Sequence, residues 1–481
     1  MEFTYIRNRI REYETYHLVK EILLLLKEEE KKDVSHLSPI LLLLKWTFQF
    51  SEEKYPYKYA SRGDVLRLLK HIYKLEEEKN FFMIHEGVGI NKLLNVLSYQ
   101  QSYLQIKVWK DSFARQNLLF HDLKSRYSIE EVFYKKSGLT IQEFLLLIYI
   151  LYLYINPDRY GLDWHYNGWI NENFFNLTKG LFNESKISSF LRLLTFPTNK
   201  KSDVIQKHGK VKSYDLQPFE ISIFTQYPLM LFESRIIVIH RNIFNYTTNF
   251  YLYDYLKTID NEKFSEEFGK RLEKYVEIGL KEINIPYLTE NELRNRYSGK
   301  IVDFLVDENI LIECKAIEIE PYPNIHPDDK VIINWLKKSI IKAYCNQMLS
   351  IVSQNDKDEF WGIILTYKET HFGTGSDAWN SFLKTPTLET CKTNRYTYEK
   401  IPPENLFFID LAVWDKLILI IKEGKASLKE ILTKARENNK NDRTKKYLFS
   451  NHLDCYDPGP VNQDYLIKGY QFITDILKSM K

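Results

Sequence analysis

The chain has 481 residues, of which 44% are hydrophobic and 27% are charged. A chain of this length is expected to form two or three domains with sizeable cores, and its composition excludes broad disorder. The net charge of +3 is close to neutral. A nucleic-acid surface would therefore have to come from local clusters of Lys and Arg.

Cysteine spacing and the apolar segments indicate a cytoplasmic protein. The four cysteines are scattered without a C-x-x-C spacing, which argues against a zinc ribbon or a disulfide framework and fits a reducing compartment. The first residues lack the apolar region of a signal peptide. The longest apolar run, 144–155, has 12 residues, whereas spanning a bilayer takes about 20. We therefore expect no membrane partner.

Residues 1–215 are predicted to form a mainly helical region. Leu- and Ile-rich segments with charged flanks at helical spacing lie at 18–26, 40–48, 65–75 and 141–155. The polar, basic stretch 198–212 is the best candidate for a linker, and we expect it to be a solvated loop.

The character of the chain then changes. Residues 216–260 are predicted to be a short β-rich connecting segment, with strands at 219–224, 228–232 and 235–240. Residues 261–415 alternate between helix and strand, which indicates an α/β domain. In this domain we expect helices at 264–280 and 328–352, and strands at 301–306, 310–316, 360–367 and 406–411. Residues 416–481 are predicted to be a helical tail with a basic run at 434–446.

Two charged residues interrupt the apolar, strand-like run 310–317. Glu313 and Lys315 are two positions apart, so in a strand they share one face while Ile312 and Cys314 face the other way. Charges inside such a run are costly unless they are paired or bind a metal. Glu-x-Lys also occurs in acid-rich helices of this chain, so only this context gives the pattern meaning.

A hairpin register would bring a third group to the same place. Residues 307–309 fit a three-residue loop in which Asn309 takes a positive φ. If Val306 pairs with Ile310, Asp303 lies opposite Glu313, with Cβ atoms about 4.5–5.5 Å apart. Two carboxylates this close repel each other unless a divalent cation lies between them.

Two carboxylates and a lysine suit phosphodiester hydrolysis. Mg²⁺ prefers carboxylate and water oxygens, polarises a phosphoryl oxygen and lowers the pKa of a bound water. Lys315 would position that water or stabilise charge on the phosphate.

The pattern Asp303-x9-Glu313-x-Lys315 on a hairpin, after a Glu-bearing helix and before a long helix and a strand, resembles the PD-(D/E)xK, or restriction-endonuclease-like, nucleases. The resemblance covers roughly residues 262–370. It implies an α/β core in the order α-β-β-β-α-β, here joined to a large helical N-terminal region and a helical tail. Val302 replaces the Pro of the family name, which removes no ligand.

The resemblance also implies a Glu on the first helix and a Gln on the helix after the third strand. Glu273, in the setting Gly-x-x-x-Glu-x-x-Val, is the first choice, and Glu266 and Glu277 are alternatives on the same helical face. Gln347 matches the second position. The implied metal ligands are Asp303, Glu313 and Glu273, holding Mg²⁺ or, in its place, Mn²⁺.

The function we expect is that of a metal-dependent endonuclease acting on DNA ahead of RNA, in bacterial defence against foreign nucleic acid by analogy with other stand-alone nucleases of this kind. The helical region would recognise a target, a partner protein or a second copy of the chain. Two alternatives stay open: an inactive nuclease fold kept for nucleic-acid binding or assembly, and a surface hairpin with cross-strand ion pairs.

Weaker features have ordinary explanations. Lys337, Lys338 and Lys342 are candidates for phosphate contacts, with solvated charge as the default. The glycine-containing segment 366–375 would approach the nucleic-acid backbone or form a plain loop, and the aromatic segment 163–169 would stack on bases or pack in a core.

Overall fold

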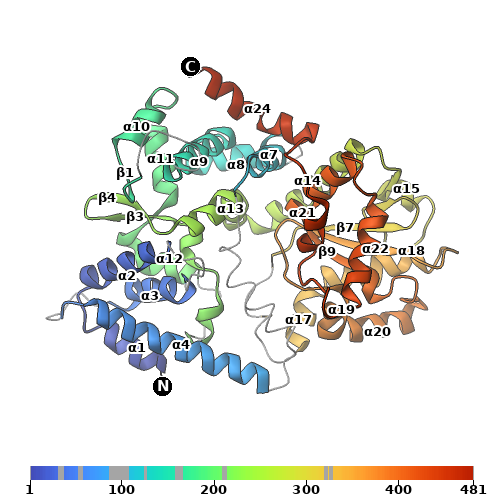
Figure 1. The fold of residues 1–481 in the computed structure, drawn as a ribbon, viewed down its shortest axis with the longest axis horizontal. Helices are drawn as coiled ribbons and strands as arrows, with labels where there is room; N and C mark the ends of the chain where they lie inside the picture. The colour runs from blue at the N-terminus through green and yellow to red at the C-terminus, as the bar shows by residue number, and fades with distance from the viewer. Residues whose placement is uncertain are drawn as a thin grey trace.

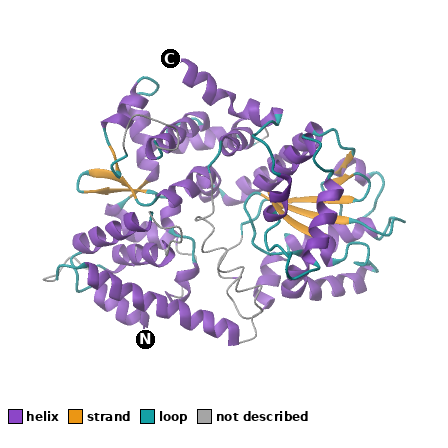
Figure 2. Ribbon diagram, in the orientation of Figure 1, coloured by secondary structure: helices purple, strands orange, loops and turns teal. Residues whose placement is uncertain are grey.

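The computed structural model describes residues 2–30, 37–51, 58–85, 108–123, 127–157, 166–208, 214–318, 323 and 329–479. Figure 1 shows two parts side by side, a mainly helical part from the first half of the chain and an α/β part from the second half. Helices dominate both parts, and the strands gather in two small sheets (Figure 2). The predicted combination of a helical region with an α/β region is confirmed at this level.

The first four helices pack together as the start of the helical part. They are α1 (Glu2–Ile10), α2 (Thr15–Glu29), α3 (Leu37–Phe50) and α4 (Arg62–His85). The leucine stripes that predicted helices at 18–26, 40–48 and 65–75 supply their common core, and α3 is buried along almost its whole length.

A second group of helices surrounds the apolar helix α9 (Ile141–Ile155). Thr140 and Glu143 form a capping box that fixes its start, and nearly all its side chains are buried. Within the described residues no single helix has both the length and the apolarity to cross a membrane, although α8 and α9, which meet at 63°, reach both as a pair. The other members are α7 (Lys110–Asn117), η1 (Leu118–Asp122), α8 (Ile129–Ser137), α10 (Glu172–Lys179) and α11 (Glu184–Leu194).

A four-stranded sheet in the order β1-β4-β3-β2 joins residues before and after position 215. Its strands are β1 (Trp169–Ile170), β2 (Thr195–Phe196), β3 (Leu229–Phe232) and β4 (Arg235–Val238). β3 and β4 confirm the strands predicted at 228–232 and 235–240.

The strand predicted at 219–224 is wrong. The chain there forms two 3₁₀ turns, η4 (Tyr214–Phe219) and η5 (Ile223–Thr225). Pro218 lies inside the first turn, and the Ser222 side chain accepts a hydrogen bond from the backbone of Phe224 to start the second. Both features favour a turn over an extended strand.

The loop predicted over 198–212 is wrong for the residues that the structure describes. Residues 198–208 form η3 (Thr198–Lys200) and α12 (Lys201–His208), because Val204 and Ile205 pack against the core of α1–α4. Positions 209–213 lie outside the described residues. The segment 216–260 is also less β-rich than predicted, since the 19-residue helix α13 (Arg241–Ile259) fills its second half.

The α/β part begins with α14 (Asn261–Glu282), as predicted, and continues into a five-stranded sheet. The strands follow chain order across the sheet, with β5, β6 and β7 antiparallel and β7, β8 and β9 parallel. They are β5 (Tyr287–Thr289), β6 (Phe304–Val306), β7 (Ile310–Lys315), β8 (Trp361–Thr366) and β9 (Leu406–Asp410). The four strands predicted for this domain match β6 to β9.

Helices cover both faces of this sheet. Phe304 and Ile312 point into a core shared with α14 and α21 (Leu411–Lys422), whereas Leu305 and Leu311 point into a second core under the segment 329–352. The single helix predicted at 328–352 is wrong in its continuity. It is divided into α17 (Asp329–Leu336), a turn, the π-helical η6 (Lys342–Met348) and α18 (Leu349–Val352).

Short elements and the tail complete the α/β part, and the last helix, α24, returns to pack against α7 of the helical part (Figure 1). These elements are α15 (Glu290–Arg294), α19 (Gly375–Ala378), η7 (Trp379–Leu383), α20 (Lys384–Asn394), η8 (Pro403–Asn405), α22 (Leu428–Asn439), α23 (Ser450–Leu453), η9 (Asp454–Tyr456) and α24 (Asp464–Ser479).

Candidate active site

The β6–β7 hairpin has the predicted register. Val306 pairs with Ile310 and Phe304 with Ile312, so Asp303, directly before β6, comes opposite Glu313. The turn differs in one detail. Asp307 and Glu308 take positive φ values of 46° and 62°, whereas Asn309 does not. The backbone N–H of Asn309 closes the turn on the Val306 carbonyl at 3.3 Å, as in a type I′ turn, which needs positive φ at both central residues.

The carboxylates of Asp303 and Glu313 each accept a hydrogen bond from the backbone on the opposite side of the hairpin. The backbone N–H of Asp303 donates to Glu313 Oε2 at 3.2 Å, and the backbone N–H of Cys314 donates to Asp303 Oδ2 at 2.7 Å. Two carboxyl groups thus meet at the open end of the hairpin, each held by a backbone donor.

Lys315 and Gln347 both reach the other oxygen of Glu313. The Lys315 ammonium forms an ion pair with Oε1, and Gln347 Nε2 donates to the same atom at 2.6 Å. Gln347, on η6, also donates to the Ile301 carbonyl at 2.9 Å, so it ties the helical layer to the segment before β6 that carries Asp303. The Glu313 side chain is only 1% exposed.

Of the three candidate glutamates on α14, Glu273 is the one that interacts with this cluster. Glu266 is exposed and pairs with Lys270, and Glu277 pairs with Lys281 and accepts a hydrogen bond from the Tyr287 hydroxyl at 3.0 Å. Burial and the Glu313 carboxylate raise the pKa of Glu273 to about 7.

The cluster has more carboxyl groups than its lysine can balance. Burial followed by the charge of Glu273 raises the pKa of Asp303 to about 7, and burial followed by the charge of Asp303 raises that of Glu313 to about 8. Burial lowers the pKa of Lys315, but Glu313 and Asp303 outweigh it and leave that pKa above its ordinary value. Ionising all three carboxyl groups beside one ammonium is therefore unfavourable unless further positive charge arrives.

The donor set fits a hard divalent cation. Carboxylate oxygens are the ligands that Mg²⁺ prefers. The Oε1 atom of Gln347 is also buried without a hydrogen-bond partner among the described residues, so the site has an acceptor for one more group. As the side chains stand, no three His, Cys, Asp or Glu residues in the described part of the chain form a metal-binding group. Glu313 is engaged by Lys315 and Gln347 instead.

The sequence did not point to Glu290. It lies in the first turn of α15, pairs with Arg294, and its charge raises the pKa of both Glu273 and Asp303. No local motif marks this position, because only the packing of α15 beside β6 brings it here.

The weaker candidates lie elsewhere. Lys337 and Lys338 are exposed, and Lys342 is half-buried at the start of η6. In the segment 366–375, Lys368 is buried and pairs with Asp254 of α13 and with Glu318 at 2.5 and 2.8 Å. Residues 163–165 of the aromatic segment lie outside the described residues, and the Arg235 guanidinium stacks on Trp169, 4.6 Å from its ring centre.

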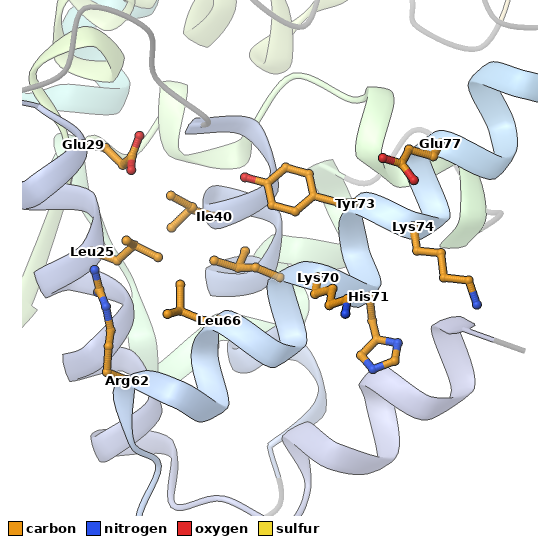
Figure 3. Close-up of a pocket in the computed structure, with 11 residues that line it drawn as sticks. Leu25, Glu29, Ile40, Arg62, Leu66, Lys70, His71, Tyr73, Lys74 and Glu77 are labelled. Carbon is orange, nitrogen blue, oxygen red and sulfur yellow. The ribbon is translucent and has the colours of Figure 1, made fainter.

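A cavity of about 630 Å³ lies between α2, α3 and α4, far along the chain from this cluster. In Figure 3 the side chains of Leu25, Ile40 and Leu66 gather in its middle, with Glu29 and Arg62 toward its edge. The candidate active site draws no residue from these helices.

The cluster at the open end of the β6–β7 hairpin combines carboxylate oxygens of the kind that bind metals, an ammonium and a positioning amide. Such a set can bind a cation, hold a water and stabilise a developing negative charge. In comparisons with known proteins, the chain matches no protein family, no curated protein and no solved structure.

Proposed function

We propose that this protein is a metal-dependent nuclease that hydrolyses phosphodiester bonds, with DNA preferred over RNA as substrate. The observation behind the proposal is the cluster of Asp303, Glu313 and Lys315 on one hairpin, with Glu273 acting on it from α14. The order α14, β5, β6, β7, the helical segment 329–352 and β8, with the short α15 between β5 and β6, is compatible with the α-β-β-β-α-β order of the PD-(D/E)xK nucleases and supports the proposal.

Each residue has a role in this proposal. Asp303, Glu313 and Glu273 would hold Mg²⁺ or Mn²⁺, which polarises the phosphoryl oxygen and lowers the pKa of a bound water. Lys315 would orient the attacking water and stabilise negative charge on the phosphate. Gln347 would orient the Glu313 carboxylate through its hydrogen bond to Oε1. The cellular role we propose, defence against foreign nucleic acid, rests on the resemblance alone.

The test is cleavage of plasmid, single-stranded DNA and RNA with Mg²⁺ or Mn²⁺. We expect wild type to cleave and Lys315→Ala and Asp303→Ala to be slower by about a hundredfold or more, since each removes a group that acts on the reacting phosphate or its metal. Lys300→Ala is the matched control, because Lys300 is an exposed lysine three residues before Asp303.

Two results would contradict the proposal. One is the absence of cleavage by folded wild-type protein on every substrate with either metal. The other is equal cleavage by wild type and Lys315→Ala, which would point to a contaminating nuclease. Nucleic-acid binding without cleavage would instead support an inactive nuclease fold.

A further inference from the structure

A second cavity, of about 440 Å³, lies where the two parts of the molecule meet. Its floor comes from residues at or after the carboxyl ends of the parallel strands β7, β8 and β9, among them Glu318, Thr370 and Asp410. Its other wall comes from α7 and α13 of the helical part, including Gln116 and Phe250. The carboxyl ends of parallel strands are a common place for ligand sites in α/β proteins, and the volume suits a small molecule.

Four of the residues that line this cavity each carry a buried polar atom with no hydrogen-bond partner among the described residues. These atoms are Asp111 Oδ1, Gln116 Oε1, Thr370 Oγ1 and His371 Nδ1. Gln116 and Thr370 are each 2% exposed and His371 is 6% exposed. Leaving buried polar groups unpaired is costly, so four of them on residues around one cavity indicate a ligand that small side-chain movements would let them reach.

All four atoms are able to accept hydrogen bonds. The Gln116 amide is oriented by its Nε2, which donates to the carbonyls of Ser112 and Thr248 at 3.2 and 2.9 Å, so Oε1 is left as an unused acceptor. The other carboxylate oxygen of Asp111 pairs with Arg115 at 3.3 Å. Burial lowers the pKa of His371 to about 4, so its ring is neutral and one ring nitrogen accepts. A matching ligand is rich in N–H donors.

The charges around the cavity favour a cation. Five carboxyl-bearing residues line it: Asp111, Glu318, Glu369, Asp410 and Asp454. Burial and the neighbouring Glu369 raise the pKa of Asp410 to about 7, a sign that local positive charge is scarce.

Three basic residues line the cavity, and two of them are already paired inside the protein. Arg115 binds Asp415 at 2.7 Å, and Lys368 binds Asp254 and Glu318. The third, Lys416, is exposed. Trp109 and Phe250 add aromatic rings to the lining, and such rings attract organic cations.

We propose that this cavity binds a small organic cation that carries several N–H donors, of the aliphatic polyamine class. The amines would donate to Asp111, Gln116 and Thr370, and the surrounding carboxylates and aromatic rings would stabilise the positive charge. The proposal is independent of the nuclease assignment, because no residue of the cavity belongs to the cluster around Lys315 and binding is measured without nucleic acid.

The test is isothermal titration calorimetry of the full chain with spermidine, with adenosine and AMP as neutral and anionic probes. We expect saturable binding of spermidine at one site per chain. Thr370→Val should weaken it about three- to tenfold and Asp111→Asn about ten- to a hundredfold, as expected for losing a neutral and a charged acceptor. Thr387→Val is the matched control, since that hydroxyl is buried and bonded to the Leu383 carbonyl outside the cavity.

The melting temperatures of the variants without spermidine separate a loss of binding from misfolding. The Thr370 hydroxyl has no partner among the described residues, so Thr370→Val should melt no earlier than wild type without spermidine. The proposal is overturned if wild type binds no spermidine at millimolar concentration, or if both cavity variants bind it as tightly as wild type does. It is also overturned if AMP or adenosine binds as well as spermidine.

Discussion

Two buried lysine–glutamate pairs, Lys45–Glu220 in the helical part and Lys315–Glu313 in the α/β part, are built differently. In the helical part, Lys45 of α3 donates to Glu220 Oε2 at 2.9 Å and to Gln217 Oε1 at 3.1 Å. Trp46 Nε1 donates to the same Gln217 oxygen at 2.9 Å. One ammonium thus faces one carboxylate, with the neutral amide of Gln217 beside them.

In the α/β part, Lys315 pairs with Glu313, but the charges of Asp303 and Glu273 act on the same place. Three carboxyl groups share one ammonium, and burial with mutual repulsion raises the pKa of each of the three. A buried pair in which one ammonium balances one carboxylate needs no ligand and can serve the fold alone. An unbalanced cluster at a strand end calls for an additional positive charge, as a metal-dependent site does.

The largest effect on stability should come from the balanced pair. Lys45→Met leaves the Glu220 carboxylate buried without its ammonium, which should lower the free energy of unfolding by about 3–5 kcal/mol. Cleavage per folded molecule should be unchanged, because Lys45 lies outside the candidate active site. Urea denaturation and a cleavage assay on the folded fraction measure the two quantities.

The double variant Lys45→Met/Glu220→Met is the control, and it should recover much of the lost stability because no unpaired charge remains. If Lys45→Met loses as much specific activity as Lys315→Ala does, the assignment of Lys45–Glu220 to stability and Lys315–Glu313 to activity is wrong.

The hairpin could be predicted from sequence because its signals are local. Charges two apart in an apolar strand, and a short polar loop of suitable length, set the register that places Asp303 opposite Glu313. The turn detail was wrong because Asp307 and Glu308, rather than Asn309, take the positive φ values.

Other features depend on tertiary neighbours. The sequence places Glu266, Glu273 and Glu277 on one helical face and does not distinguish them. The structure does, because Glu266 pairs with a lysine and Glu277 with a lysine and a tyrosine, which leaves Glu273 for the cluster. A continuous helix was predicted at 328–352. The structure instead has a break after Leu336 and a π-helical segment that contains Gln347. The strand predicted at 219–224 is wrong because the prediction used β-rich composition alone and gave no weight to Pro218 and the Ser222 cap, which favour turns.

A smaller effect, on activity, should come from the amide that orients Glu313. Gln347→Ala removes the hydrogen bonds to Glu313 Oε1 and the Ile301 carbonyl. We expect cleavage to slow about ten- to a hundredfold and the Mg²⁺ concentration for half-maximal rate to rise, as for other residues that orient metal ligands.

Gln354→Ala is the matched control for this variant. Gln354 also joins the helical layer to the segment before β6, since its Nε2 donates to the carbonyls of Ser298 and Ser350, but none of its hydrogen bonds within the described residues reaches Glu313. Equal Mg²⁺ dependence of the two variants would mean that Gln347 acts only through the fold.

The smallest effect should be a pH-dependent gain of stability from removing one charge of the unbalanced cluster. Because the pKa of Asp303 is raised to about 7 from 3.8, the folded protein holds a proton in this window that the unfolded chain releases. Wild type without metal should therefore lose stability as pH rises from about 4 to 7. Asp303→Asn keeps an oxygen for the Cys314 N–H and removes the charge, so it should be about 1–2 kcal/mol more stable than wild type at pH 8 and nearly equal to it at pH 4.

Mg²⁺ should raise the melting temperature of wild type at pH 8 more than that of the variant, because binding to the folded state stabilises it. A variant less stable than wild type at pH 8 without metal would show that the Asp303 charge is already balanced within the fold, and the two lysine–glutamate pairs would then be alike.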